Sequence, residues 1–119
     1  MTTRSAAGNT PMSPEAVNEI VRSGIEKSTL SNSVKARFAS CCLIEPKSGL
    51  VWLDEFHARL PGHVPGSRVV WFVTQSDPQS VFFDERDGSF GACWGPARDG
   101  AQYVDLGYRS LDPVEMFVA

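Results

Sequence analysis

The strongest constraint on the fold is a series of short β-type segments joined by short links. The segments 69–74, 81–84, 90–94 and 103–106 are rich in branched and aromatic residues, which favour strands. An Asp-Gly pair at 87–88 separates the second segment from the third, and such a pair between two strands is a strong hairpin signal. A second pair, at 99–100, precedes the fourth segment. The sequence therefore predicts a four-stranded antiparallel meander.

Helix signals flank the meander on both sides. Ser-Pro-Glu at 13–15 offers a capping side chain, a proline suited to the first turn and an early acid. The apolar residues that follow share one helical face, which predicts a helix at about 14–27. The face comprises Val17, Ile20, Val21 and Ile25. Near the other end, Ser-Leu-Asp-Pro at 110–113 predicts the cap and first turn of a short helix over 114–118.

Residues 31–46 fit two interpretations. Ser31 or Ser33 would cap a second helix that places Val34 and Phe38 on one face. The run Cys-Cys-Leu-Ile-Glu at 41–45 fits a short buried strand equally well. Pro46 and the Lys-Ser-Gly after it should end either element. An apolar strand-type run follows at 50–53, and 54–67 should be mostly loop.

These elements predict an α+β domain over 13–119, preceded by a disordered arm at 1–12. The chain has 119 residues, which is enough for one hydrophobic core. The first helix needs a surface for its apolar face, and one face of the sheet supplies it. We expect the four-stranded meander to pack against one or two N-terminal helices, with a short C-terminal helix.

Composition excludes several classes of protein. The net charge of −3 opposes general nucleic-acid binding, because such proteins are normally basic. No apolar run approaches the length of a membrane span, and residues 1–15 lack the apolar core of a secretory leader. Three cysteines in no metal-type spacing favour a reducing compartment, so we expect a cytoplasmic protein. No phosphate-loop or dinucleotide motif is present, and no cofactor is expected.

Catalytic groups are sparse. Cys93 with His57 is the only pairing that suggests a thiol enzyme, and it depends on a contact that the sequence does not specify. His57 and His63 lie near two acids but lack the spacing of a known metal motif. Cysteines are usually buried structural residues. The sequence therefore predicts neither a catalytic site nor a metal site.

Charge and aromatic residues are both concentrated in the second half of the chain. Residues 77–119 carry eight acidic residues against three arginines, which favours an acidic surface for a basic partner. Asp is also common in turns for backbone reasons, so part of this excess needs no partner. Phe82 and Phe83 must point to opposite sides of a strand. Either the chain covers both faces of its sheet, or an aromatic row is exposed for binding.

The segments 82–91, 94–95 and 103–108 resemble small bacterial immunity proteins of the SMI1/KNR4 type, in which aromatic strands alternate with Asp-Gly turns. The resemblance implies a non-enzymatic protein that binds and blocks a cognate toxin, for example a basic nuclease. A small ligand-binding module and a cysteine enzyme are the alternatives. The expected partner-binding residues are Asp84, Glu85, Asp87, Trp94, Asp99, Tyr103 and Asp105.

Overall fold

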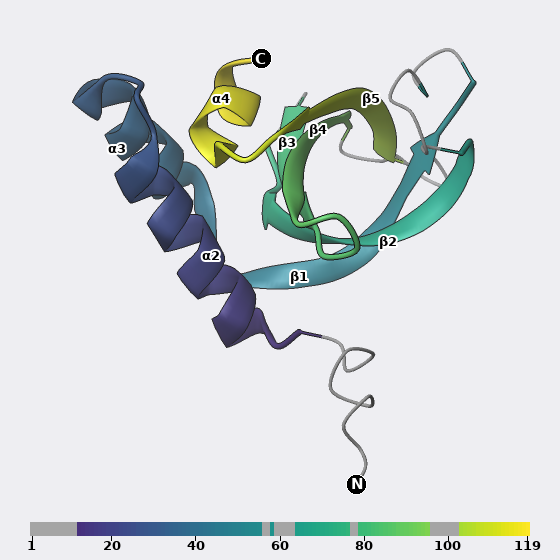
Figure 1. The fold of residues 1–119 in the computed structure, drawn as a ribbon, viewed down its shortest axis with the longest axis horizontal. Coiled ribbons are helices and arrows are strands. Elements are labelled where there is room, and N and C mark those ends of the chain that lie inside the picture. The colour runs from purple at the N-terminus through teal and green to yellow at the C-terminus, as the bar shows by residue number, and fades with distance from the viewer. Residues whose placement is uncertain (1–11, 56–57, 59–63, 77–78, 96–102) are drawn as a thin grey trace, which may run out of the picture.

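The computed structural model describes residues 12–55, 58, 64–76, 79–95 and 103–119. Within them, two helices precede five strands and a short final helix (Figure 1). The α+β class, the antiparallel sheet and the placement of the helices are confirmed. Asp99-Gly100 and residues 1–11 of the expected arm lie outside the described residues, and Met12 packs against the core beneath the helices. The elements are α2 (Pro14–Lys27), α3 (Asn32–Cys41), β1 (Cys42–Leu53), β2 (Gly66–Thr74), β3 (Gln79–Asp84), β4 (Ser89–Trp94), β5 (Tyr103–Ser110) and α4 (Pro113–Val118).

The helices begin where the sequence provides caps. The Ser13 hydroxyl accepts a hydrogen bond from the backbone N–H of Ala16 at 3.1 Å, and Pro14 occupies the first position of α2. Asp112 caps α4 in the same way, accepting from the backbone N–H of Val114 at 2.9 Å. Its second oxygen accepts from the Ser28 hydroxyl at 2.7 Å, which ties α4 to the end of α2. None of the helices within the described residues is long and apolar enough to span a bilayer.

Both interpretations of residues 31–46 hold in part, because the helix ends and the strand begins between Cys41 and Cys42. The prediction that the strand is buried at 41–45 is wrong, because Cys41, Ile44 and Glu45 are exposed. The prediction that Pro46 ends the element is wrong. Strand β1 continues through Pro46 to Leu53, and its pairing with β2 shifts between Cys42 and Lys47. Such an irregularity accommodates a residue that has no N–H for the ladder. The run at 50–53 is therefore the end of a long strand.

The sheet has five strands, so the prediction of four is wrong, and it closes into a barrel. Neighbours β1 to β5 pair antiparallel in chain order. In such a meander the first and fifth strands run in the same direction, so closure requires a parallel pair. Strands β1 and β5 make that pair, with Val51 opposite Tyr103 and Trp52 opposite Val104. Closure removes the exposed edges that an open meander would leave.

Two hydrophobic cores form on the two sides of the barrel wall. The interior core contains Phe72 and Phe82, whereas Phe83 and Phe90 belong to a core between the barrel and the helices. The rings of Phe83 and Phe90 lie 5.2 Å apart. Because the chain supplies a core on each side, Phe82 and Phe83 are both buried although they point in opposite directions.

Candidate functional site

The expected partner-binding residues do not form one surface. Asp84 and Asp105 are fully buried, and Asp99 lies outside the described residues. Glu85 and Tyr103 are half-buried, whereas Asp87 and Trp94 are exposed. Asp84 pairs with Ser89 at the turn end of the β3–β4 hairpin, and Trp94 pairs with Gln79 at its open end. These ends are separated by about 17 Å of strand.

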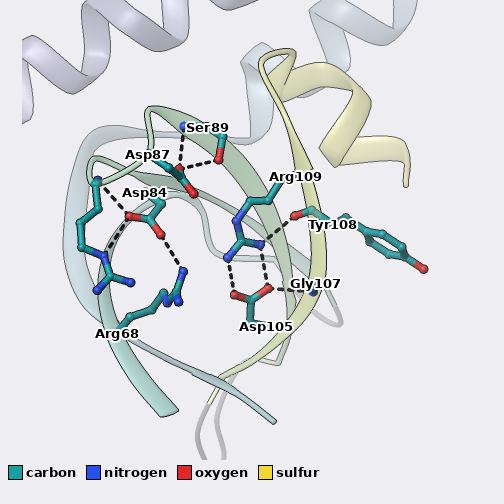
Figure 2. Close-up of polar contacts among 9 residues, drawn as sticks. Arg68, Asp84, Asp87, Ser89, Asp105, Gly107, Tyr108 and Arg109 are labelled. Atoms are coloured by element: carbon teal, nitrogen blue, oxygen red, sulfur yellow. Dashed lines mark hydrogen bonds and ion pairs between the residues drawn. The ribbon is translucent and has the colours of Figure 1, made fainter. Parts of the chain in front are cut away.

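Asp84 is a structural anchor at the turn end of the barrel. Its Oδ2 accepts from Nη1 of Arg68 at 3.1 Å, and its Oδ1 accepts from the backbone N–H of Arg86 at 3.0 Å (Figure 2). The Nε of Arg86 lies 3.6 Å from the same Oδ1. A single carboxylate thus joins β2 to the β3–β4 turn. Its burial follows from strand alternation, because Asp84 points to the same side as Phe82.

Asp105 forms a second buried ion pair inside the barrel. Its oxygens accept from Nη1 and Nη2 of Arg109 at 3.0 and 2.7 Å, and from the backbone N–H of Gly107 at 2.8 Å (Figure 2). Gly107 has φ +84°, a conformation that favours glycine, and the β4–β5 pairing is irregular in this region. The guanidinium of Arg109 also lies 5.0 Å from the ring centroid of Phe82, within cation–π range. The contacts of Asp105 lie within β5 and inside the barrel, so Asp105 does not present its charge at the surface.

Two further acids make contacts that shape the surface near the turn. Asp87 accepts from the backbone N–H of Ser89 at 3.0 Å and from its hydroxyl at 2.6 Å. Glu85 accepts from the indole N–H of Trp71 at 2.7 Å. Several of the acidic residues that suggested a binding surface therefore stabilise turns or the barrel interior. Asp87 agrees with the expectation that Asp is common in turns for backbone reasons.

A continuous apolar surface lies on the outside of the barrel. Trp52 on β1 pairs with Val104 on β5, and Val104 pairs with Trp94 on β4. Register partners point to the same side of a sheet, so these three residues form a lateral row. Trp52 is 40% exposed and Trp94 54% exposed. A second pair, Leu50 opposite Val69, adds exposed apolar area beside the row. We call the five residues the tryptophan face: Leu50, Trp52, Val69, Trp94 and Val104.

Sequence reasoning missed every residue of this face except Trp94. A signal was available in the run at 50–53, because Leu50 and Trp52 must point away from Val51 and Leu53. If Val51 and Leu53 face a core, Leu50 and Trp52 must therefore lie on the opposite side of the strand. The lateral neighbours Val104 and Trp94 were not predictable, because they depend on the parallel β1–β5 pairing.

Two of the three cysteines, Cys42 and Cys93, are poorly suited to nucleophilic chemistry. Burial, reinforced by the nearby negative charge of Asp105, raises the pKa of the Cys93 thiol to about 12. Burial also raises the pKa of Cys42 to about 11. Both groups are therefore protonated near neutral pH, whereas the thiolate is the nucleophilic form. His57, the proposed partner of Cys93, lies outside the described residues, within which no cluster of metal-ligating side chains occurs.

The tyrosine of the expected set also supports the barrel. The ring centroid of Tyr103 lies 4.7 Å from that of Phe72 in the interior core. Burial raises the pKa of its hydroxyl, with a further contribution from Cys93. Tyr103 precedes Val104 in β5, so it points inward beneath the tryptophan face and helps to fix its position.

Comparisons of the chain with protein-family models, with curated proteins and with solved structures find no match. Functional assignment therefore depends on the geometry of the described residues and on the sequence patterns.

Proposed function

We propose that this protein is a non-enzymatic binding protein that holds a partner protein against its tryptophan face. The observation that carries the proposal is the registered row of Trp52, Val104 and Trp94 on the outside of a closed barrel. Trp residues dominate the binding energy of many protein interfaces. A small barrel filled by its own side chains holds such residues in fixed positions. The face therefore provides two aromatic anchors about 10 Å apart.

The narrower form of the proposal is immunity: the partner is a cognate bacterial toxin, and binding blocks it. The resemblance of residues 82–91, 94–95 and 103–108 to SMI1/KNR4-type proteins supports this. The net charge of −3 also supports it, because an acidic protein associates faster with a basic partner such as a nuclease. Blocking a toxin requires a stable surface and no catalytic group, which agrees with the protonated, buried thiol of Cys93.

The proposed contact set differs from the acids and aromatic residues taken from the sequence alone. Glu85, Asp87, Trp94 and Asp99 keep their proposed role as contacts, and Trp52 joins them. In this proposal Asp84, Tyr103 and Asp105 act indirectly, because each supports the barrel from within. Long-range attraction then comes from the whole charge of the protein, whereas affinity comes from the tryptophan face.

The test is a pull-down with the tagged protein from lysate of its own source, followed by mass spectrometry. Wild type should retain one stoichiometric partner that the double variant Trp52→Ser/Trp94→Ser loses. Tyr108→Ser is the matched control, because Tyr108 is an exposed aromatic residue four positions beyond Val104 on β5. Purified wild type should then inhibit the activity of the isolated partner. Equal retention by all three proteins, or a partner whose activity is unchanged, would overturn the proposal.

A further inference from the structure

A groove of about 480 Å³ continues from the tryptophan face toward the β3–β4 turn. Leu50 and Val69 belong to both surfaces, so the groove and the face are contiguous. Its volume is in the range of sites that hold a side chain or a small molecule. The residues that line it are Leu50, Ser67, Arg68, Val69, Trp71, Glu85 and Arg86.

The apolar part of the groove is ordered before anything binds. Leu50 and Val69 are cross-strand partners, and Trp71 follows two positions after Val69 on the same side of β2. The indole N–H of Trp71 donates to Oε1 of Glu85 at 2.7 Å, which fixes the orientation of the ring. A preorganised aromatic surface loses little side-chain entropy when an apolar group packs on it.

The polar end of the groove has an exposed cation. Asp84 is shared by two arginines: the buried Arg68 contacts Oδ2, whereas the side chain of Arg86 is 60% exposed and its Nε is 3.6 Å from Oδ1. A separation of 3.6 Å is too long for a hydrogen bond. The guanidinium groups of Arg68 and Arg86 thus share the single buried carboxylate of Asp84. The other charged group of the groove is Glu85, whose Oε1 is held by the neutral indole N–H of Trp71, so Glu85 keeps its negative charge and its orientation is fixed.

We infer that this groove accepts an apolar side chain from a segment of the partner protein, with an adjacent carboxylate of that segment paired to Arg86. Because the occupant belongs to the partner, the inference rests on the proposed function. The guanidinium favours a carboxylate, since its planar donors match the two oxygens. The negative charge of the whole protein acts at long range, whereas Arg86 selects one acidic residue at contact distance.

The inference is tested without the partner, by titrating ¹⁵N-labelled protein with the peptide acetyl-Asp-Leu-Phe-amide. The indole N–H resonance of Trp71 is the readout, assigned with the variants Trp52→Phe and Trp94→Phe. We expect a saturable shift with a dissociation constant in the millimolar range. Acetyl-Asn-Leu-Phe-amide should bind about two- to fivefold more weakly, the difference that a partly exposed ion pair supports.

Arg86→Gln should abolish the preference for the Asp peptide, and 0.5 M salt should reduce it in wild type. Arg22→Gln is the matched control, because Arg22 is an exposed arginine on α2 whose ion pair is with Glu19. That variant should keep the preference. The dispersion of the spectrum shows whether Arg86→Gln is folded. No saturable shift at Trp71, equal binding of both peptides, or an unchanged preference in Arg86→Gln would each overturn the inference. The pull-down with the tryptophan variants tests the proposed function separately.

Discussion

Phe90 and Trp94 lie on the same strand and point to the same side of the barrel wall, yet their surroundings differ completely. Phe90 is 2% exposed beneath the helices, whereas Trp94 is 54% exposed. The helices pack on one side of the barrel, and α4 contacts β3, β4 and β5 (Figure 1). The same outward alternation thus produces a core at one end of β4 and an exposed aromatic surface at the other. An apolar residue that the fold leaves uncovered is a candidate for binding.

Phe90 and Trp94 should differ most in their contribution to the free energy of unfolding. Phe90→Ala should lower the free energy of unfolding by about 4 kcal/mol, because it removes a buried ring and leaves a cavity. Trp94→Ala should lower it by less than about 1 kcal/mol, since exposed substitutions cost little. Urea denaturation of both variants measures the difference. Similar losses would mean that Trp94 belongs to a core.

The next effect concerns the charges inside the barrel. Asp105→Asn should cost about 3 kcal/mol, because it leaves the buried guanidinium of Arg109 without its counter-charge. Asp87→Asn, at an exposed acid of the turn, is the control and should cost less than about 1 kcal/mol. Thermal unfolding followed by circular dichroism distinguishes them. If the two variants melt together, the stability of the barrel does not depend on the Asp105–Arg109 pair.

Alkaline pH should lower the stability of the protein through the buried thiol of Cys93. Burial raises the pKa of the Cys93 thiol from its ordinary value of 9.0 to about 12, so the folded state retains a proton that the unfolded state loses between these values. Stability is therefore fully present below about pH 9 and falls as pH rises toward 12, by up to about 1.4 kcal/mol per unit. Cys93→Ala should fall less steeply in urea titrations between pH 8 and 10. An identical slope would contradict the burial of this thiol.

Gly107, at the bulge where the β4–β5 pairing is irregular, should have a smaller effect on stability. Gly107→Ala should cost about 1 kcal/mol, because φ is +84° at this position and alanine is strained there. Gly88 has φ +72° in the β3–β4 turn, so Gly88→Ala gives a matched value for an exposed turn. Differential scanning calorimetry of the two proteins provides the measurement. A more stable Gly107→Ala variant would show that the bulge is not required.

The parts of the fold that depend on local chemistry were predictable. The caps at Ser13 and Asp112 define α2 and α4, and the Asp-Gly pair at 87–88 defines the hairpin. The closure of the barrel was not predictable, because only two registered pairs join the run at 50–53 to β5. A local pattern does not encode a contact between residues some fifty positions apart.

The candidate site was predictable only in part for the same reason. Trp94 was found from composition, but Trp52 became its neighbour through closure. Asp84 and Asp105 were predicted to be surface acids because their partners were not evident from the sequence. Asp84 pairs with Arg68 on another strand, and Asp105 pairs with Arg109 across the bulge of β5. Strand alternation did place Asp84 on the side of Phe82, and that signal would have indicated burial.

Calorimetry with the purified partner tests the tryptophan face as the binding surface, by comparing the partner's affinity for wild type, Trp52→Ser/Trp94→Ser and Tyr108→Ser. We expect the double variant to lose at least about 30-fold in affinity, the effect of removing an interface hot spot. Tyr108→Ser should change affinity by less than about threefold, and all three proteins should unfold at similar urea concentrations. Undiminished binding by a folded double variant would contradict the assignment of the tryptophan face as the binding surface.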